Sequence, residues 1–381
     1  MSSKKLTDEY FMKIAIKEGY KGLGKTSPNP AVGAVMVTPD KKKIIAKGYH
    51  KAYGLPHAEV EAIKKAKEKA KGAILYVTLE PCSHYGKTPP CTEKILEAGI
   101  SEVICGIRDP NPVAKGGLEI LKNHGIKVKC GVLAKDVKIL TRFFLSRILR
   151  KHPWVIMKVA GSLDGKISVS TGDSKWITGL EARKYSHKLR AISDAILVGK
   201  NTVIKDNPEL TCRLIKGKNP VRIILDTNLS LNPDYKIFKV SKNKKTIIAC
   251  GDHISQEKEN IFKKKGVEIW KLPLKNQKVD LNALLEKCYE SGISSLLVEG
   301  GGKVHGSFLN EDLVDEVFYF VGPIIIGDKK GTPAIEGKPL SSLKEAIYLN
   351  DLKIKKLGNS FLFHAFTEKG IKLINTPLEF L

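Results

Sequence analysis

Two successive runs of alternating strand-like and helix-like segments constrain the fold of this 381-residue chain more than any other feature. In the first run, four segments carry the alternation: strand-like stretches at 31–37 and 73–79, and helix-like stretches at 57–70 and 91–99. The strand-like stretches are short and apolar, as in strands buried within a sheet, whereas the helix-like stretches are closed by glycines. Alternation of this kind predicts a sheet that is covered by helices on its faces.

A break near Pro153 separates the two runs. A helical stretch through 137–150 leads to this proline, after which the strand-like pattern starts again. The strand-like segments of the second run lie at 154–160, 194–199, 221–226, 245–250, 294–300 and 316–326. Because a chain of this length exceeds what one hydrophobic core usually organises, we predict two α/β domains, at 1–147 and 148–366, and a C-terminal tail of unknown role at 367–381.

The formal net charge of +25 suggests either a polyanionic partner or lysine-rich faces in contact with water. Lysines occur along almost the whole chain, in short clusters at 41–43, 242–245 and 263–265, without the arginine–aromatic interleaving that grips single-stranded nucleic acid. We therefore expect no nucleic-acid partner. The same positive field would attract a phosphorylated small substrate.

Cysteine content and hydropathy bear on the compartment. The chain has seven cysteines, an odd number, and its first residues lack the apolar run of a secretory signal. No apolar stretch approaches the ~20 residues that are needed to cross a bilayer. These features predict a cytoplasmic protein that has neither a disulfide framework nor a membrane partner.

His57, Cys82 and Cys91 are candidate ligands of a metal ion. Imidazole and thiolate ligands together suit Zn²⁺, and three protein ligands leave the fourth tetrahedral position for water, which is the stoichiometry of a catalytic site. His84, in the loop between the two cysteines, is an alternative fourth ligand. A fourth protein ligand would close the site and favour a noncatalytic zinc-binding scaffold.

Glu59 follows His57 by two residues, a spacing that separates side chains by roughly 200° on a regular helix. Both side chains reach one site only if the helix begins there, and Pro56 favours a helix start at this point. Pro90 favours a second start at Cys91, whose thiolate would then lie at the positive end of the helix dipole. Two helix N-termini are thus predicted to converge on the metal.

The parts H-x-E and P-C match the signature of zinc-dependent deaminases, in which the glutamate is a general acid/base and not a ligand. Glu59 is accordingly the candidate catalytic residue. Eight residues separate Cys82 from Cys91 where two are usual, and the longer loop would close over a small substrate. A nucleic-acid-editing deaminase with an appended basic module is the alternative.

The stretch 294–309 in the second run reads as a strand, a glycine turn and a helix. Backbone amides at such a helix start can receive a pyrophosphate. The order of a dinucleotide-binding Rossmann unit is absent, because the glycines lie near the end of the domain rather than after its first strand.

Linked motifs across both halves resemble one known family. They are SPNPAVGAVMV, GYHKAYGLPHAEVEA, TLEPCSHYGKTPPCTEKILEAGI and DPNPVAKGGLEIL in the first half, and MKVAGSLDGKIS, GDSKWITG, LRAISDAILVGKNTVIKDNPELTCR and LLVEGGGKVHGSFL in the second. Over about residues 8–330 the chain closely resembles the bifunctional deaminase/reductase of riboflavin biosynthesis, whose own pattern includes the long cysteine spacing. The resemblance implies a cytidine-deaminase-like α/β/α domain followed by a dihydrofolate-reductase-like α/β domain.

The resemblance also implies the chemistry. Such a deaminase uses Zn²⁺ to convert 2,5-diamino-6-ribosylamino-4(3H)-pyrimidinone 5′-phosphate to 5-amino-6-(5-phosphoribosylamino)uracil and ammonia. The reductase then turns the ribosyl group into a ribityl chain with NADPH. The expected partner is therefore a phosphorylated pyrimidine, and we expect a homo-oligomer.

Site residues follow from the resemblance position by position. It places Asn29 and His50 at the deaminase substrate, and Lys87 where the family often carries arginine. In the reductase it implies substrate contacts from Lys158, Ser174, Arg190, Leu210, Arg213 and Glu299. It implies an NADPH site formed by Ala160, Trp176, Thr202, Asp206, Thr227, Gly301, Gly302, Lys303, Val304, His305, Gly306 and Ser307. Guanidinium groups match phosphate geometry, so Arg190 and Arg213 are the expected clamps for the 5′-phosphate.

Overall fold

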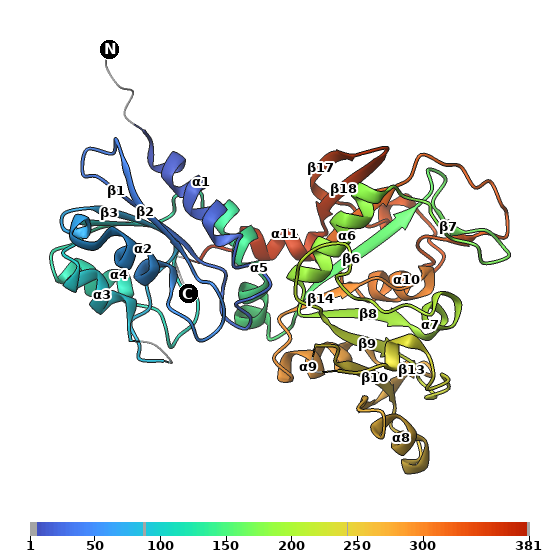
Figure 1. The fold of residues 1–381 in the computed structure, drawn as a ribbon. Coiled ribbons are helices and arrows are strands. Elements are labelled where there is room, and N and C mark those ends of the chain that lie inside the picture. The colour runs from blue at the N-terminus through green and yellow to red at the C-terminus, as the bar shows by residue number, and fades with distance from the viewer. Residues whose placement is uncertain (1–5, 87–88, 242, 379–381) are drawn as a thin grey trace. The chain divides into compact units, whose positions relative to one another are not determined.

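The computed structural model describes residues 6–86, 89–241 and 243–378 (Figure 1). The chain divides into two compact units, the first formed by residues 1–151 and 373–381 and the second by residues 152–372. Pro153, where the sequence pattern breaks, lies next to this division. None of the helices in the described part of the chain combines the length and the apolar character that spanning a membrane requires.

A five-stranded sheet forms the centre of the first unit, in the order β2-β1-β3-β4-β5. The strands are β1 (Gly33–Val37), β2 (Ile44–Tyr49), β3 (Ile74–Leu79), β4 (Glu102–Ile107) and β5 (Lys127–Lys129). β1 pairs antiparallel with β2 and β3, whereas β3, β4 and β5 run parallel. Every residue of β1 and β3 is buried, as expected for strands that are covered on both faces.

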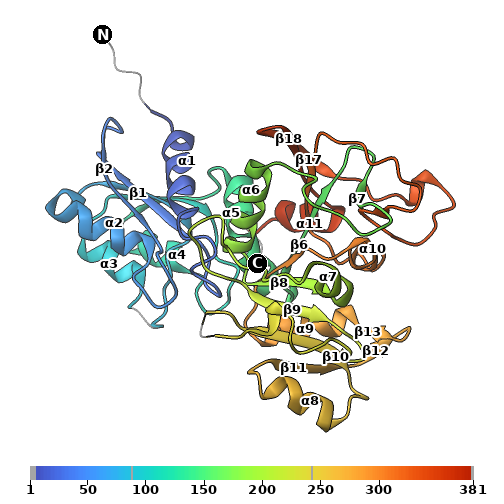
Figure 2. The same cartoon turned by 45° about the vertical axis from the view of Figure 1, so that its right-hand side comes forward.

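Helices cover both faces of this sheet (Figure 2). They are α1 (Asp8–Gly19), α2 (Ala58–Ala66), the 3-10 helix η1 (Lys67–Ala70), α3 (Cys91–Glu97), α4 (Gly117–Asn123) and α5 (Ala134–Arg150). α1 and α5 lie on one face, and α2, α3 and α4 on the other. α1 begins at an N-cap, because the Thr7 hydroxyl accepts a hydrogen bond from the Tyr10 amide at 3.3 Å.

Residues 373–378 belong to the first unit although they lie near the end of the chain. α11 (Glu368–Asn375) leads into this segment, in which Ile374 and Leu378 are buried. The Lys138 ammonium on α5 donates a hydrogen bond to the Thr376 carbonyl oxygen at 2.7 Å. The predicted tail 367–381 therefore contains a helix and part of the first unit.

A nine-stranded sheet forms the centre of the second unit, in the order β11-β10-β9-β8-β14-β6-β15-β18-β17. Its strands are β6 (Trp154–Gly161), β8 (Ala195–Gly199), β9 (Val221–Leu225), β10 (Thr246–Gly251), β11 (Glu268–Leu272), β14 (Ser295–Val298), β15 (Glu316–Val321), β17 (Asn350–Leu357) and β18 (Ser360–Phe366). Two short pairs stand apart, β12 (Leu274–Lys275) with β13 (Lys278–Val279) and β7 (Lys166–Ser168) with β16 (Thr332–Pro333). The sheet is parallel from β11 to β15, and β18 and β17 join it antiparallel.

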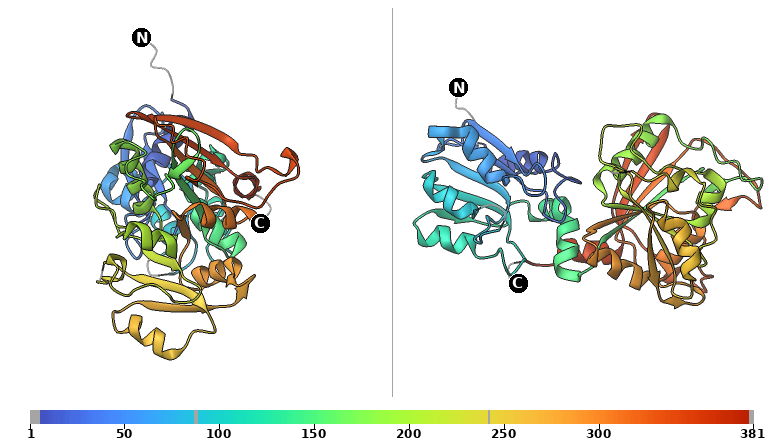
Figure 3. Two further views of the ribbon diagram at one scale, coloured as in Figure 1. Left: turned by 90° about the vertical axis from the view of Figure 1, so that its right-hand side faces the viewer. Right: turned by 60° about the horizontal axis from the view of Figure 1, so that its bottom comes forward.

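Helices lie against this sheet as well (Figure 3). They are α6 (Leu180–Ile192), α7 (Lys200–Asp206), η2 (Lys236–Phe238), α8 (Gln256–Lys263), α9 (Leu281–Glu290), α10 (Gly302–Asn310) and η3 (Leu343–Glu345). A hydrophobic core lies between one face of the sheet and α9 and α10, and it includes Leu284, Leu285, Phe308, Val155 and Leu296. On α6, Tyr185 packs against Phe318 and Phe320 of β15.

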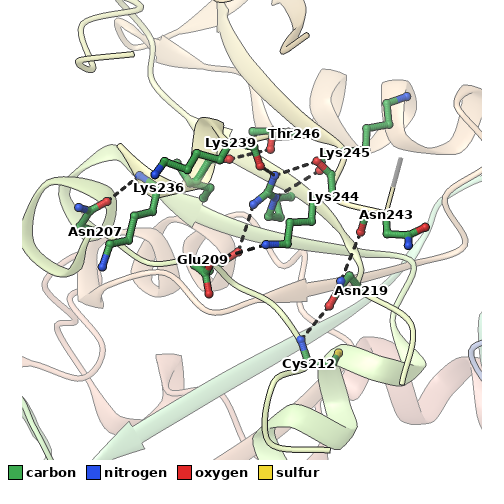
Figure 4. Close-up of polar contacts among 12 residues, drawn as sticks. Asn207, Glu209, Cys212, Asn219, Lys236, Lys239, Asn243, Lys244, Lys245 and Thr246 are labelled. Atoms are coloured by element: carbon green, nitrogen blue, oxygen red, sulfur yellow. Dashed lines mark hydrogen bonds and ion pairs between the residues drawn. The ribbon is translucent and has the colours of Figure 1, made fainter. Parts of the chain in front are cut away.

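Arg222 on β9 is a buried arginine that is bonded to main-chain carbonyl groups, and 1% of its surface is exposed. Its guanidinium donates hydrogen bonds to four carbonyl oxygens, at 3.3 Å from Glu209, 3.5 Å from Lys239, 2.8 Å from Lys244 and 3.4 Å from Lys245 (Figure 4). Burial lowers the pKa of Arg222 to about 10. One side chain on β9 thus binds the segment at Glu209 and the segment that contains Lys239, Lys244 and Lys245.

Replacement of Arg222 by methionine tests this role. We expect Arg222→Met to lower the free energy of unfolding of the second unit by about 2–4 kcal/mol, because four carbonyl groups lose the hydrogen bonds of the buried guanidinium. Tryptophan fluorescence during urea unfolding reports on that unit alone, since Trp154, Trp176 and Trp270 all lie in it. The control is Lys258→Met on the exposed surface of α8. Equal midpoints for the two variants would contradict the role.

Candidate active sites

A cavity of about 450 Å³ in the first unit gathers most of the residues predicted for the deaminase. Its lining includes Asn29, His50, His57, Glu59, Cys82 and His84. These residues come from loops and helix starts that the sheet brings together, at the ends of its strands. The structure therefore assembles one site from segments that are up to about 50 residues apart in the sequence.

The ligand atoms of His57, Cys82 and Cys91 all lie within 4.8 Å of one another. Nδ1 of His57 is 3.2 Å from Sγ of Cys91 and 3.5 Å from Sγ of Cys82. Ligand atoms around a tetrahedral zinc ion are roughly 3.3–3.8 Å apart, given metal–ligand bonds of about 2.0–2.3 Å. The donor set and its spacing therefore fit Zn²⁺.

Two helix starts produce this geometry. His57 is the N-cap of α2, and Cys91 is the first residue of α3, as Pro56 and Pro90 predict. The Cys91 amide donates a hydrogen bond to Sγ of Cys82 at 3.4 Å. Hydrogen bonding from the Cys91 thiol lowers the pKa of Cys82 to about 4. The lowered pKa favours the Cys82 thiolate, which is the form that binds metal.

Glu59 lies in the first turn of α2, with 3% of its surface exposed. Its Oε2 atom is buried and has no hydrogen-bond partner within the described residues. Burial raises the pKa of this carboxyl group to about 7. A carboxyl group that titrates near neutral pH can both accept and release a proton, which suits a general acid/base.

His50 and Asn29 lie in the same cavity. Nδ1 of His50 is 3.2 Å from the Pro56 carbonyl oxygen, and its ring packs edge-on against that of His57 at 5.2 Å. Because a carbonyl only accepts, Nδ1 carries the proton and Nε2, buried and without a partner among the described residues, is an acceptor. Burial lowers the pKa of His50, so the neutral ring is favoured. His50 and Asn29 can therefore form hydrogen bonds with donor and acceptor groups of a polar ligand.

His84 lies beside the metal group without joining it. It lines the cavity, but over the described ranges of the chain the group of candidate metal ligands consists of His57, Cys82 and Cys91. This arrangement favours the three-ligand, catalytic stoichiometry over a closed structural site. Lys87 lies outside the described residues, so the expectation for it stays a prediction.

Sequence reasoning missed three polar residues of this cavity, Glu80, Asp109 and Asn111. The buried Glu80 carboxylate accepts hydrogen bonds at 3.0 Å from the amides of Asp109 and Leu118 and so joins the loop after β3 to that after β4. Burial raises the pKa of Asp109 to about 7. One signal could have found these residues: they follow strands β3 and β4, and ligands in open α/β sheets bind beyond the carboxyl ends of the strands.

A second cavity, of about 850 Å³, lies in the second unit. All six residues predicted to contact the reductase substrate line it, namely Lys158, Ser174, Arg190, Leu210, Arg213 and Glu299. Of the predicted cofactor residues, the cavity is lined by Ala160, Trp176, Thr202, Asp206, Gly301 and His305. The other predicted cofactor residues lie outside its lining, namely Thr227, Gly302, Lys303, Val304, Gly306 and Ser307.

Glu299, just after β14, is the buried charge at the centre of the second cavity. Arg190 on α6 binds it with two parallel hydrogen bonds of 2.9 and 2.8 Å and donates a third bond to the Thr211 carbonyl at 3.2 Å. The Lys158 ammonium on β6 is 3.7 Å from the same carboxylate. Burial acts to raise the pKa of Glu299, but Arg190 and Lys158 hold it at about 2. Arg190, expected to clamp a phosphate, thus directs three of its N–H groups to Glu299 and Thr211, and its role toward a phosphate stays a prediction.

Two histidines of the second cavity have a defined protonation state. His305 on α10 is 2.9 Å from the Ala334 carbonyl oxygen through Nδ1, and its Nε2 is buried without a partner among the described residues. Burial lowers the pKa of His305. His187, which sequence reasoning missed, accepts a hydrogen bond at Nδ1 from the Leu214 amide at 3.2 Å. Burial and Arg190 lower its pKa to about 4, so both rings are neutral at pH 7.

The glycines of α10 have a packing role. A Cβ atom at Gly302 would lie 2.3 Å from the Pro333 carbonyl oxygen, and one at Gly306 would lie 1.9 Å from that of Glu336. Only glycine permits this approach of α10 to the segment 333–337. Gly301, the N-cap of α10, lines the cavity instead and presents the helix start to a ligand.

Two family models match the chain, one in each unit. Residues 5–107 match the cytidine and deoxycytidylate deaminase zinc-binding region, and residues 153–363 match the RibD C-terminal domain. The first match covers the candidate metal ligands, and the second covers the whole lining of the second cavity. The fold is thus a cytidine-deaminase-like domain followed by a reductase domain, as expected.

Relatives match along nearly the entire chain. The riboflavin biosynthesis protein RibD of Bacillus amyloliquefaciens is 40% identical over 95% of this chain and 97% of its own, and that of Aquifex aeolicus is 42% identical over 93% and 97%. A Thermotoga maritima structure titled as a diaminohydroxyphosphoribosylaminopyrimidine deaminase/5-amino-6-(5-phosphoribosylamino)uracil reductase is 42% identical, with a TM-score of 0.81 over 94% of this chain and 98% of that one. A RibD structure from Acinetobacter baumannii is 34% identical, with a TM-score of 0.84 over the same shares.

Zinc content tests the metal group. We expect the purified protein to contain zinc. Cys91→Ser should lose most of it, because the two ligands that remain, His57 and Cys82, bind zinc only weakly without the third. Inductively coupled plasma mass spectrometry on dialysed protein, with circular dichroism to verify folding, measures this. Cys130→Ser is the matched control, since Cys130 lies outside the group. Equal zinc in the wild type and Cys91→Ser would rule out the assignment.

Proposed function

This chain belongs to the RibD family of bifunctional deaminase/reductases of riboflavin biosynthesis, and on that premise we propose which reaction each unit catalyses. The first unit deaminates 2,5-diamino-6-ribosylamino-4(3H)-pyrimidinone 5′-phosphate. The second reduces the ribosyl group of the product to ribityl with NADPH. A nucleic-acid-editing deaminase is not favoured, because relatives of this one family match both halves.

The arrangement of Glu59 carries the proposal for the first unit. Its unpaired, buried carboxyl oxygen lies in the same cavity as His57 and Cys82, on the same helix start as His57. A buried carboxyl oxygen without a hydrogen-bond partner costs stability, which a proton-transfer role would explain. The cavity of about 450 Å³ has room for a small substrate rather than a nucleic-acid strand.

The deamination follows from these residues. His57, Cys82 and Cys91 would hold the zinc ion, which when bound supplies Lewis acidity that makes water nucleophilic at neutral pH. Glu59 takes one proton from the attacking water and delivers it to the ring nitrogen, and it then passes the proton of the newly added hydroxyl group to the departing amine. Water adds to the ring carbon, the exocyclic C–N bond breaks, and ammonia leaves. Asn29 and the acceptor Nε2 of His50 orient the pyrimidine edge.

The second cavity supports the reduction. NADPH when bound supplies the hydride. Ala160, Trp176, Thr202, Asp206, Gly301 and His305 are placed to hold the cofactor, and the start of α10 suits its pyrophosphate. Glu299, fixed by Arg190 and Lys158, accepts hydrogen bonds from ribosyl hydroxyl groups, and Arg213 binds the 5′-phosphate.

Three further expectations belong to this proposal. The first unit is the deaminase domain and the second the reductase domain, with the division at about residue 151. None of the seven cysteines, all of which lie in the described residues, forms a disulfide, which supports a cytoplasmic location. A homo-oligomer stays a prediction, to be measured by analytical ultracentrifugation.

The direct test supplies purified protein with the diaminopyrimidine phosphate, with and without NADPH. We expect ammonia release in both cases and NADPH oxidation only after deamination. Absorbance at the NADPH band and a coupled ammonia assay follow the two steps. Absence of both activities in folded, zinc-containing protein would refute the proposal.

Glu59→Gln should separate the two activities. We expect ammonia release to fall by at least ~100-fold, in line with the loss of a general acid/base, while zinc content is retained. Reduction of the supplied deaminated intermediate should stay near the wild-type rate, because its residues lie in the other unit. Equal loss of both activities in a folded variant would contradict the two-site assignment.

Arg213→Ala should weaken recognition of the phosphorylated intermediate. Loss of one charge-assisted contact predicts a KM that is about 10- to 100-fold higher. Ammonia release and the KM for NADPH should stay unchanged, since they depend on other residues. The dephosphorylated intermediate is the control: wild type should discriminate against it, and the variant should discriminate less. A normal KM for the phosphorylated intermediate would exclude Arg213 as a phosphate ligand.

A further inference from the structure

One wall of the second cavity carries a group of cations that no motif indicated. Lys236 and Lys239, at the start and just after the end of η2, line the cavity together with Arg213. All three side chains are exposed. η2 lies beside the segment 206–214, because the Lys236 amide donates a hydrogen bond to Oδ1 of Asn207 at 2.8 Å (Figure 4).

The acidic residues of the cavity do not neutralise these cations. Glu299 is bound by Arg190 and Lys158, and Glu209 is 3.5 Å from the Lys244 ammonium on the far side of the segment. Within the described part of the chain, Lys236, Lys239 and Arg213 form no ion pair. Asp206 is the remaining carboxylate of the lining. Three cations against one carboxylate produce a positive field that favours an anionic ligand.

Arg222 fixes the backbone that carries these lysines. Its guanidinium bonds to the carbonyl oxygens of Glu209 and Lys239, one in each of the two segments that form the wall (Figure 4). The side chains of Lys236 and Lys239 extend from η2 toward the side where Asn207 lies. The bases of both lysine side chains are therefore held in place, and only their flexible stems adapt to a ligand.

We propose that Lys236 and Lys239 bind the phosphate monoester of a ligand in the second cavity, on the wall that also carries Arg213. The inference rests on the proposed function, which supplies two such groups: the 5′-phosphate of the substrate and the 2′-phosphate of NADPH. A phosphate dianion needs more than one cation for neutralisation, and the positive charge of Arg190 is already compensated by the Glu299 carboxylate. The lysines would thus make the reductase bind a phosphorylated ligand more tightly than the same ligand without the phosphate.

The test compares the double variant K236A/K239A with a matched control, K258A/K264A. The control removes two exposed lysines at α8, outside the cavity lining, and so changes the net charge equally. Steady-state reduction is measured with the phosphorylated deaminated intermediate, its dephosphorylated form, NADPH and NADH. The wild type is assayed first: if it reduces nothing, the proposed function fails, whereas the inference is judged only against an active wild type.

We expect K236A/K239A to raise the KM for one phosphate-bearing ligand by about tenfold relative to the control variant. A rise for the phosphorylated intermediate alone identifies the substrate phosphate, and a rise for NADPH but not NADH identifies the cofactor 2′-phosphate. Either result supports the proposal. Unchanged KM values, or equal increases for ligands with and without the phosphate, overturn it.

Discussion

Desolvation of charged groups is the constraint around which both cavities are built. In the second unit, Glu299 loses its contact with water but gains a two-point bond from Arg190 and the charge of Lys158. Removal of one partner from such a buried pair typically costs 3–5 kcal/mol, so the three groups fix one another in place. In the first unit, hydrogen bonds from Cys91 stabilise the Cys82 thiolate. Each cavity therefore has a rigid charged centre, to which more mobile residues add specificity.

The metal group of the first unit was predictable because its causes are local. Pro56 and Pro90 determine the helix starts that orient His57 and Cys91, and both prolines are adjacent in sequence to the residues they position. Glu80 was not predictable in the same way. Its carboxylate joins amides that lie 29 and 38 residues further along the chain, and no short pattern records such a contact.

In the second unit, too, the roles that depend on long-range contacts could not be predicted from short sequence patterns. The six predicted substrate residues meet at one cavity, but the glycine stretch was expected to bind cofactor throughout, whereas Gly302 and Gly306 instead allow α10 to pack closely. Arg222 and the η2 lysines gave no signal, because a buried arginine bonded to carbonyl groups depends on where two segments meet β9. β17 was missed although Leu352 and Ile354 alternate with lysines along it, and nearly all its residues are exposed.

The return of the chain to its first unit has a consequence for the order of synthesis. Residues 152–372 form the second unit, and the buried Ile374 and Leu378 join the first only after that unit has been made. When residues 1–151 have been synthesised, the Thr376 carbonyl group, to which Lys138 donates a hydrogen bond, does not yet exist. The last segment of the first unit is therefore synthesised after the whole of the second unit, so neither unit can complete its contacts until synthesis of the chain has almost ended.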